Sequence, residues 1–464
     1  MTALVLDGVA VDGPEGPIVA PATLRAAPGV PLVLLGETGS GKSLLAQAVM
    51  GTLPAGLVAS GAVRLGGEVL PAGMVAGRRA LWGHRIAMLP QEPWAALDPT
   101  MPALPQVAEV PRFLAGLPWR AARARAGEAL AAVGLAPGER RYPFQLSGGM
   151  CQRVALAATR IAGAPVLLAD EPTKGLDAAL RDSVAALLTG EAARGATLMV
   201  ITHDIALARA LGGELAVMRE GAVVEQGPVE RVLAAPSHPY TRRLLAAEPQ
   251  AWEPWPRRQA GAVVVEGRGL AKRFGRQRLF AGLDVALGGG EVVALAGPSG
   301  TGKSTLGNML LGLVAPDAST VRRRDGLPAF ALQKLYQDPL AGFAPAMTLG
   351  DALGAVIRRH RLDPFLAVRL RERLRLSPAL LGRRPDQVSG GELQRFALLR
   401  ALMLDPVLLF ADEPTSRLDL LTQAEVMALL REVVAETGMA LLLVPHDAAM
   451  AGKVAQRLVA LRPG

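Results

Sequence analysis

The sequence predicts an α/β chain of two tandem domains, each built on a parallel β-sheet with helices on both faces. With 464 residues, the chain is long enough for two domains that have cores of their own. One set of glycine-rich, carboxylate and histidine motifs occurs twice in the same order, which indicates an internal duplication. Short apolar runs alternate with helical stretches such as residues 119–134, and such runs are typical of strands buried on both faces of a parallel sheet.

The duplication sets the expected domain boundaries. We expect a first domain at residues 1–250, a linker at residues 251–261 and a second domain at residues 262–464. The segment 248–261 contains three prolines and two tryptophans. Because proline blocks regular structure and favours an extended backbone, we expect a short and fairly stiff connection.

The composition is typical of a globular protein and gives no indication of a nucleic-acid-binding surface. Half of the residues are apolar, and the net charge is +9. That charge fits either an acidic partner or arginines spread over solvated faces. No dense basic block with interleaved aromatic residues occurs, so we favour the second interpretation and expect no nucleic-acid partner. The single cysteine, Cys151, excludes an intrachain disulfide and a cysteine zinc site, which fits a reducing cytoplasm.

No segment is expected to cross a membrane or to direct secretion. The longest uncharged run, residues 43–63, is long enough to span a bilayer, but it contains proline and several glycines. We expect a helix, a turn and a strand there instead. The N-terminus has neither a basic region nor a long apolar core, so a secretory signal is not expected.

Each domain begins with an expected strand, near Leu4 and near Val263, and the next strand leads into a phosphate loop. In such a loop the glycines let backbone N–H groups face phosphate oxygens, and the following helix adds its positive end. The lysine is expected to reach the β- and γ-phosphates, and the serine places a hydroxyl on Mg²⁺. The loops consist of Gly36, Glu37, Thr38, Gly39, Ser40, Gly41, Lys42 and Ser43 in the first domain, and Gly297, Pro298, Ser299, Gly300, Thr301, Gly302, Lys303 and Ser304 in the second.

A later apolar strand in each domain, VLLAD or VLLFAD, ends in a pair of carboxylates. The first of each pair, Asp170 or Asp412, is placed to hold Mg²⁺. The second, Glu171 or Glu413, is the natural group to polarise an attacking water. Such a pair could also cap a helix, but its position after a phosphate loop in both domains favours catalysis.

Two further motifs also recur. His203 and His446 follow the next strand, and the repeated position favours a contact with the γ-phosphate over a structural role. A serine and two glycines begin a helix in each domain and form a second anion-binding nest. We expect each nest to serve the nucleotide of the other domain, so that Ser389 closes on nucleotide held by Lys42, and the two halves pair within one chain. The nest residues are Ser147, Gly148, Gly149 and Gln152 in the first domain, and Ser389, Gly390, Gly391 and Gln394 in the second.

These motifs resemble those of the ATP-binding-cassette (ABC) ATPases over nearly the whole chain. The resemblance implies tandem P-loop ABC ATPase domains, each with a parallel-sheet core, an antiparallel β subdomain and a helical subdomain, with ATP and Mg²⁺ as cofactors. It identifies Gln91 and Gln337 with the glutamine loop, which senses Mg²⁺ and contacts a permease, and it identifies Asp177 and Asp419 with the D-loop. The magnesium residues that it implies are Ser43, Gln91, Asp170, Ser304, Gln337 and Asp412.

The two expected ATP sites differ at the adenine. Phe274 matches the family's adenine-stacking aromatic residue in the second domain, whereas residues 10–16 of the first domain contain no aromatic residue. We expect both sites to hydrolyse ATP but to be unequal.

Three segments are similar to the oligopeptide, dipeptide and nickel importer ATPases: QEPWAALDPTM (91–101), YPFQLSGGM (142–150) and SHPYTRRLL (237–245). The second domain's YQDPLAGFAPAMT (336–348) is similar to the same glutamine loop. The resemblance implies the motor subunit of an importer for peptides, nickel or metal chelates. Its expected partners are two integral-membrane permease subunits and, through them, a solute-binding protein. Its expected location is the cytoplasmic face of the inner membrane, as a peripheral subunit.

Three alternatives remain. A soluble tandem cassette ATPase that acts on ribosomes also has two cassettes, although it usually has a long charged linker. A DNA-repair cassette ATPase usually carries large insertions and cysteine zinc modules. An ATPase component of phosphonate breakdown has similar cassettes. The ATPase sequence alone does not identify the solute.

Overall fold

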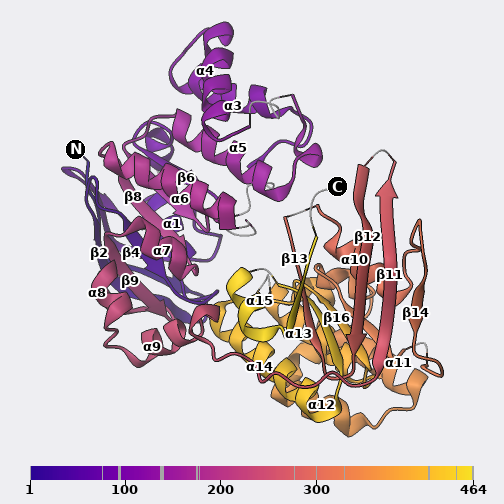
Figure 1. Cartoon of the computed structure of the whole chain (residues 1–464). Coiled ribbons are helices and arrows are strands. Elements are labelled where there is room, and N and C mark those ends of the chain that lie inside the picture. The colour runs from indigo at the N-terminus through magenta and orange to yellow at the C-terminus, as the bar shows by residue number, and fades with distance from the viewer. Residues whose placement is uncertain are drawn as a thin grey trace. The chain divides into compact units, whose positions relative to one another are not determined.

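The computed structural model describes residues 2–75, 77–91, 96–135, 140–173, 176, 178–275, 277–298, 300–328, 330–415, 418–445 and 447–461. They form two compact units, Met1–Leu245 and Ala246–Gly464, which are coloured indigo to magenta and orange to yellow in Figure 1.

The first unit contains two β-sheets. A four-stranded antiparallel sheet has the order β2-β1-β4-β5, and a six-stranded sheet has the order β10-β9-β3-β8-β7-β6. In the six-stranded sheet all neighbours are parallel except β9 and β10. The strands are β1 (Leu4–Gly13), β2 (Gly16–Ala26), β3 (Leu32–Leu35), β4 (Val58–Leu65), β5 (Glu68–Pro71), β6 (Ile86–Leu89), β7 (Val166–Asp170), β8 (Thr197–Thr202), β9 (Glu214–Arg219) and β10 (Ala222–Pro228).

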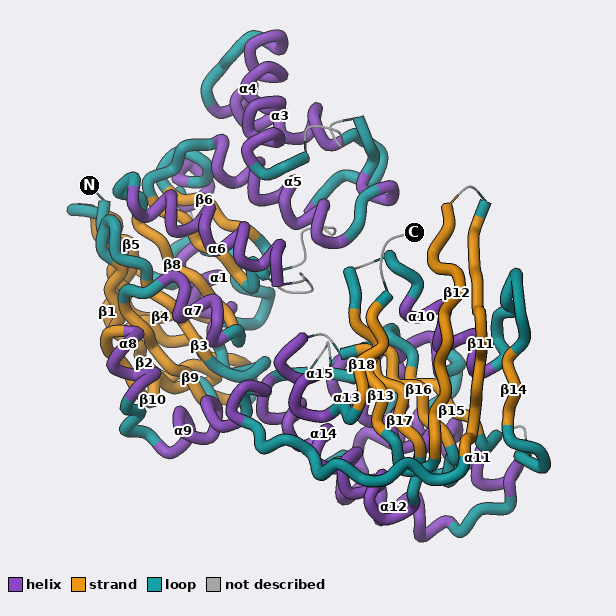
Figure 2. Tube along the Cα trace, viewed as in Figure 1, coloured by secondary structure: helices purple, strands orange, loops and turns teal. Residues whose placement is uncertain are grey.

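Helices of the first unit form two groups. The helices α3, α4 and α5 pack against one another as a separate helical subdomain, which Figure 2 shows as a purple cluster. The others connect the strands of the parallel sheet or follow them. The helices are α1 (Lys42–Met50), α3 (Ala103–Leu114), α4 (Trp119–Ala132), α5 (Gly148–Ile161), α6 (Ala178–Ala193), α7 (Ile205–Leu211), α8 (Val229–Ala234) and α9 (Pro239–Ala246).

The second unit repeats this plan in a shorter form. Its antiparallel sheet has the order β12-β11-β14, and its five-stranded parallel sheet has the order β15-β16-β17-β13-β18. The strands are β11 (Val263–Phe274), β12 (Gln277–Gly288), β13 (Val292–Ala296), β14 (Val321–Arg323), β15 (Leu332–Leu335), β16 (Leu408–Asp412), β17 (Ala440–Val444) and β18 (Arg457–Ala460). The helices are α10 (Lys303–Leu311), α11 (Leu349–His360), α12 (Pro364–Arg373), α13 (Gly390–Leu402), α14 (Leu420–Thr437) and α15 (Ala448–Val454).

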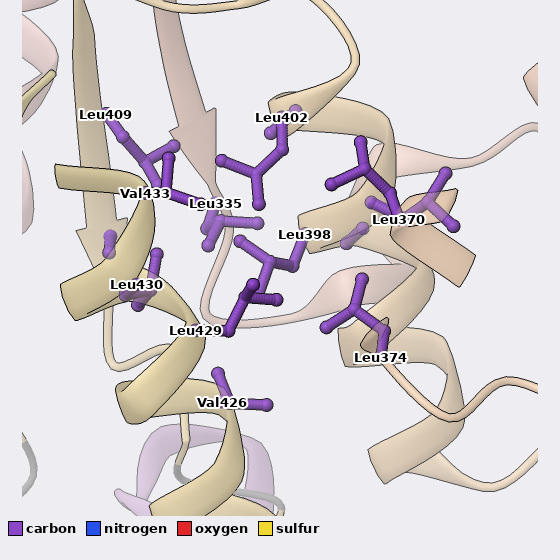
Figure 3. Close-up of a cluster of buried hydrophobic side chains, with 14 of the residues drawn as sticks. Leu335, Leu370, Leu374, Leu398, Leu402, Leu409, Val426, Leu429, Leu430 and Val433 are labelled. Carbon is purple, nitrogen blue, oxygen red and sulfur yellow. The ribbon is translucent and has the colours of Figure 1, made fainter. Parts of the chain in front are cut away.

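The central strands of both parallel sheets are buried along their whole length, because each has apolar side chains on both faces. In the second unit, the core between the sheet and its helices is mostly leucine and valine, with some alanine, methionine and aromatic residues. Figure 3 shows this cluster, in which side chains from β15, β16, α12, α13 and α14 meet. Its labelled members are Leu335, Leu370, Leu374, Leu398, Leu402, Leu409, Val426, Leu429, Leu430 and Val433.

The predicted fold class is confirmed: each unit has a parallel core and an antiparallel sheet. The run at residues 43–63 forms most of α1, a turn and the start of β4, as expected. Among the described residues, no helix combines the length and the apolar character that a membrane span requires. From Lys42 to Gln91 the chain advances 49 positions, and from Lys303 to Gln337 it advances 34. The short β14 accordingly stands where the first unit has β4 and β5.

The segment expected as a linker packs on the second unit. The side chain of Trp255 is buried in that unit's core, and its backbone N–H donates a hydrogen bond to the carbonyl of Lys453 at 2.7 Å. Arg258 donates to the carbonyl of Ala435 at 2.9 Å. Burial of the tryptophan's large apolar surface explains why these residues do not run free between the units.

Candidate active sites

In each unit, the phosphate loop, the predicted glutamine and the strand-end carboxylates lie at one edge of the parallel sheet. The carboxyl ends of parallel strands lie at the same edge, and each of these groups stands at such an end or shortly after it. In the first unit, β3 leads into the phosphate loop, β6 precedes Gln91, β7 ends at Asp170, and β8 precedes His203. In the second unit, β13, β15 and β16 lead in the same way to the loop, to Gln337 and to Asp412.

The first phosphate loop is held by the side chain of its own lysine. The Nζ of Lys42 donates to the carbonyls of Gly36 at 2.8 Å and Glu37 at 2.6 Å, and to Oγ of Ser40 at 3.1 Å. Gly41 has a φ of 93°, which favours glycine, and it is the residue just before α1. A side chain at Gly36 would collide with the carbonyl oxygen of Met218, so this position also requires glycine.

The second loop repeats this geometry with a more exposed lysine. Lys303 Nζ donates to the carbonyls of Gly297 at 2.7 Å and Pro298 at 2.9 Å, and Gly302 has a φ of 95°. Next to it, the hydroxyl of Ser304 donates to Oδ1 of Asp412 at 3.1 Å. Two of the three residues expected to bind Mg²⁺ in this unit, Ser304 and Asp412, therefore lie in direct contact.

Asp412 is buried at the end of β16. This burial raises the pKa of its carboxyl, against the opposing effects of the Ser304 hydrogen bond and of the positive charges of Lys334 and Lys303. A buried carboxylate beside a hydroxyl is an environment suited to a small divalent cation that carries phosphate ligands, whereas the two lysine charges oppose the binding of such a cation.

Both strand-end glutamates have the same unusual backbone. Glu171 has a φ of 49° and Glu413 a φ of 48°, in the left-handed region that side-chain-bearing residues rarely adopt. The backbone N–H of Glu171 donates to the carbonyl of Ile201 at 2.8 Å, and that of Glu413 donates to Val444 at 3.0 Å. The neighbouring strand thus fixes each carboxylate at the end of the sheet.

Within the described residues, the contacts of the two glutamate side chains differ. In the first unit, Oε2 of Glu171 lies 2.8 Å from Nδ1 of His203. Partial burial of the ring opposes its protonation, but the carboxylates of Glu171 and Asp204 outweigh this effect and raise the pKa of His203. In the second unit, the amide of Gln337 donates to Oε2 of Glu413 at 3.0 Å.

The predicted anion-binding nests lie at the starts of α5 and α13. Ser147 and Ser389 are the N-cap residues, and each hydroxyl accepts a hydrogen bond from the backbone N–H three residues on. Gln152 is buried, and its amide donates to the carbonyl of Pro172 at 2.9 Å, which connects the first nest's helix to the segment after Glu171. Gln394 is equally buried.

Some predicted residues stand apart or lie outside the described residues. Asp177, Ser299 and His446 are not described. Asp419 caps α14, where its carboxylate accepts hydrogen bonds from the backbone N–H and the hydroxyl of Thr422. Phe274 lies at the end of β11 with 55% of its surface exposed.

Sequence reasoning missed three features near these sites. Lys334 Nζ donates to Asn308 at 2.8 Å and interacts electrostatically with Asp412, while the equivalent position of the first unit is Met88. Alignment of strand β15 with strand β6 shows this difference.

A second missed feature is a capping box at the second nest. Glu392 accepts hydrogen bonds from the N–H and the hydroxyl of Ser389, and the Ser-x-x-Glu spacing of a capping box indicates this contact. Tyr240 contacts the first phosphate loop, and the distance in sequence conceals this contact.

Comparison with known families finds the same duplication. A profile described as ABC transporter matches residues 19–174 and 280–416, which together are more than half of the chain. Each range includes a phosphate loop and a pair of strand-end carboxylates.

Known relatives extend over almost the whole sequence. The chain is 34% identical over 471 residues to the peptidoglycan transport ATP-binding protein YejF of Agrobacterium fabrum, covering 94% of this chain and 86% of that protein. It is also 34% identical over 511 residues to the glutathione import ATP-binding protein GsiA of Salmonella paratyphi A, covering 95% and 81%. A solved archaeal ribosome recycling factor, aABCE1, in complex with the stalk protein aP1, has a TM-score of 0.69 at 21% identity, covering 98% and 87%. At this identity the likeness concerns the fold alone.

Proposed function

This chain belongs to the ABC transporter family and is an ATPase with two cassettes; from this premise we propose that it is the motor subunit of an importer of peptide-like solutes. The observation that carries the proposal is the match along 94% of the chain to a peptidoglycan transport ATP-binding protein, supported by the match to a glutathione import protein. Peptidoglycan fragments and glutathione both contain short peptides. Within the broader class of peptide, nickel and metal-chelate importers, we therefore favour a peptide-like solute.

In this proposal, each phosphate loop holds the phosphates of one ATP. Lys42 and Lys303 leave the loop carbonyls that they now contact and bind the β- and γ-phosphates. Ser43 with Asp170, and Ser304 with Asp412, hold Mg²⁺. The contact between Ser304 and Asp412 supports this assignment. When bound, Mg²⁺ neutralises charge on the phosphate oxygens.

The glutamate after each aspartate orients and polarises the water that attacks the γ-phosphate. Glu171 stands at a strand end with its backbone fixed, and its carboxylate pairs with His203. A protonated His203 donates a hydrogen bond toward the developing negative charge on the γ-phosphate while Glu171 accepts a proton from water. Glu413 has the corresponding role in the second unit, with Gln337 orienting its carboxylate.

We also propose that the two ATP sites are composite and form within one chain. Each unit has a phosphate loop and a second anion-binding nest, and one nucleotide needs only one loop. The nest at Ser389 closes on ATP held by Lys42, and the nest at Ser147 closes on ATP held by Lys303. Tethering keeps the effective concentration of each half near the other at roughly millimolar.

Nucleotide trapping at each site tests the composite arrangement. Ser389→Arg should abolish trapping at the site that contains Lys42 and leave the site that contains Lys303 able to trap. Loss at the Lys303 site alone would contradict the pairing.

The importer role requires membrane partners. We propose that residues 91–105 and 337–349 each receive a short helix from one of two different permeases, at the cytoplasmic face of the inner membrane, and that a solute-binding protein delivers the solute to them. Purification from detergent extracts should yield the chain together with two polytopic membrane proteins. Sedimentation with ribosomes, or tight DNA binding at physiological salt, would instead support a soluble tandem ATPase.

A further inference from the structure

The segment after β10 in the first unit returns to the phosphate loop. Helix α8 follows β10, and residues 237–241, with the sequence SHPYT, then form the start of α9 and the two residues before it. The hydroxyl of Tyr240, in α9, accepts a hydrogen bond from the backbone N–H of Glu37 at 3.2 Å. More than 200 positions of sequence separate these two residues, so the contact joins the end of the unit to its nucleotide-binding loop.

Hydrogen bonds to neighbouring side chains hold the SHPYT segment in place. Glu225, on β10, accepts hydrogen bonds from the backbone N–H of Ser237 at 2.7 Å, from its hydroxyl at 2.6 Å and from the N–H of His238 at 3.1 Å. Partial burial opposes ionisation of Glu225, but these hydrogen bonds prevail and lower its pKa to about 2. Nδ1 of His238 accepts a hydrogen bond from the backbone N–H of Tyr240 at 3.1 Å. The start of α9 is therefore anchored on the sheet.

Tyr240 itself has almost no freedom to move. Only 1% of its surface is exposed, and the guanidinium of Arg219 lies 5.4 Å from the centre of its ring. A buried aromatic ring has few accessible conformations, so it positions its hydroxyl at low entropic cost. The hydroxyl is thus a fixed acceptor for the loop.

Tyr240 holds the peptide group between Gly36 and Glu37, which is central to the first loop. The carbonyl of this group, that of Gly36, accepts a hydrogen bond from Nζ of Lys42 at 2.8 Å. When Lys42 moves to the phosphates, this carbonyl loses its cation. The contact between Tyr240 and Glu37 does not depend on Lys42, so it can hold the loop in both states.

The second unit cannot make the same contact. The position equivalent to Glu37 is Pro298, which has no N–H, although its carbonyl still accepts a hydrogen bond from Lys303 at 2.9 Å. The hydrogen bond from the lysine to the carbonyl at this position is thus present in both units. The backbone N–H donor at this position occurs in the first unit and not in the second.

We propose that Tyr240 is a positioning residue that pre-organises the first phosphate loop for ATP, and that the SHPYT segment exists in this fold to place it. The inference rests on the proposed ATP binding at the loop that contains Lys42. A pre-organised loop loses less conformational entropy when it binds phosphate, so the hydrogen bond raises affinity at the first site only.

The test measures Mg-ATP binding at one site at a time by calorimetry on the full-length chain. Lys303→Ala removes the second loop's lysine, so that binding reports the first site; Lys42→Ala does the reverse. Adding Tyr240→Phe to the Lys303→Ala chain should weaken Mg-ATP binding by about three- to tenfold, the range expected for one hydrogen bond. Adding it to the Lys42→Ala chain should change nothing.

A double-mutant cycle identifies the partner. Glu37→Pro gives the first loop the residue found in the second and removes the N–H donor. In that background Tyr240→Phe should have no further effect on first-site affinity. Tyr142→Phe removes the hydroxyl of another tyrosine in the same unit and serves as the matched control, with unchanged affinity expected.

The outcomes separate this inference from the proposed function. If the Lys303→Ala parent bound no Mg-ATP, the proposed function would fail at the first site, and this inference with it. If the parent bound Mg-ATP and Tyr240→Phe left its affinity unchanged, or weakened both sites equally, the positioning role alone would be wrong.

Discussion

The two units share a backbone conformation at the glutamates proposed to be catalytic, but the described side-chain contacts of the two carboxylates differ. Glu171 and Glu413 have nearly the same positive φ, and each donates its N–H to the neighbouring strand. Yet Glu171 contacts His203, and Glu413 accepts a hydrogen bond from Gln337. The duplicated fold therefore fixes where the carboxylate stands, and histidine and glutamine recur at matched positions in both units. Lys334, which stands where the first unit has Met88, is a substitution that changes the electrostatic environment of the second site.

This comparison predicts two sites that perform the same reaction with different sensitivities. The positive φ and the strand contact are features of the shared chemistry, so changes to the glutamates should affect both sites. Lys334 and Phe274 are replaced by other residue types in the first unit, so changes there should affect one site. The predictions below test this separation.

Removal of both glutamates should have the largest effect. Glu171→Gln with Glu413→Gln keeps the side-chain shape but removes the carboxylates that polarise water. Steady-state phosphate release should fall by about 10²–10⁴-fold. Mg-ATP binding should be retained, because the loops are unchanged, and unaltered hydrolysis in the double variant would refute the catalytic assignment.

The single variants divide that effect between the units. If the sites are unequal, Glu171→Gln and Glu413→Gln should leave different residual rates. Equal residual rates would show that the different surroundings of the two glutamates have no effect on turnover.

Phe274 provides the next largest difference, because the first unit has no aromatic residue at the equivalent hairpin. The ring lies at the end of β11, exposed and with Lys272 5.4 Å from its centre, so it is available to a flat ligand. Phe274→Ala should weaken Mg-ATP binding at the second site by about five- to 150-fold, as expected for loss of base stacking.

The same measurement in the Lys303→Ala chain is the control for Phe274. First-site affinity should not change there. A loss at the first site instead would mean that Phe274 does not stack on the adenine held by its own unit.

Lys334 should have a smaller effect, confined to the second site. Its ammonium lies near Asp412, and the equivalent residue of the first unit is Met88. Lys334→Met removes a cation that repels Mg²⁺, so half-saturation of second-site hydrolysis at pH 8 should need about two- to fivefold less Mg²⁺. The reverse substitution, Met88→Lys, should raise the requirement of the first site, and no change in either variant would refute this electrostatic role.

The sequence predicted the parallel cores, the phosphate loops and the strand-end carboxylates because each follows from a local pattern. Apolar runs predicted the strands, and the spacing of the glycines predicted the loops. The sequence did not predict the contact between Tyr240 and Glu37, since a contact across more than 200 positions leaves no local pattern. Nor did it predict the positive φ of Glu171, which tertiary contact with the neighbouring strand imposes. Nor did it predict that Trp255, expected in a linker, packs in the core of the second unit. Its burial depends on an apolar surface formed by residues far away in the sequence.

The smallest predicted effect is a pKa that distinguishes the first site. Glu171 raises the pKa of His203 above its ordinary value, so protonated His203 stabilises the folded unit. That stabilisation is fully present below about pH 6.5, the unperturbed pKa of histidine, and is lost as the pH rises through the raised folded-state value. The chain has five histidines, so ¹³C-labelled histidine should give five titrating NMR signals at most, and His203→Asn should identify the relevant one.

In the Glu171→Gln variant, the titration of His203 should move to lower pH, because the carboxylate that favours the imidazolium is gone. His84→Asn, which removes an exposed histidine of the same unit, is the matched control and should leave the His203 titration in place. A His203 pKa that is the same in the unaltered chain and in the Glu171→Gln variant would show that the pair at 2.8 Å does not couple the two groups, and the electrostatic difference between the units would then rest on Lys334 alone.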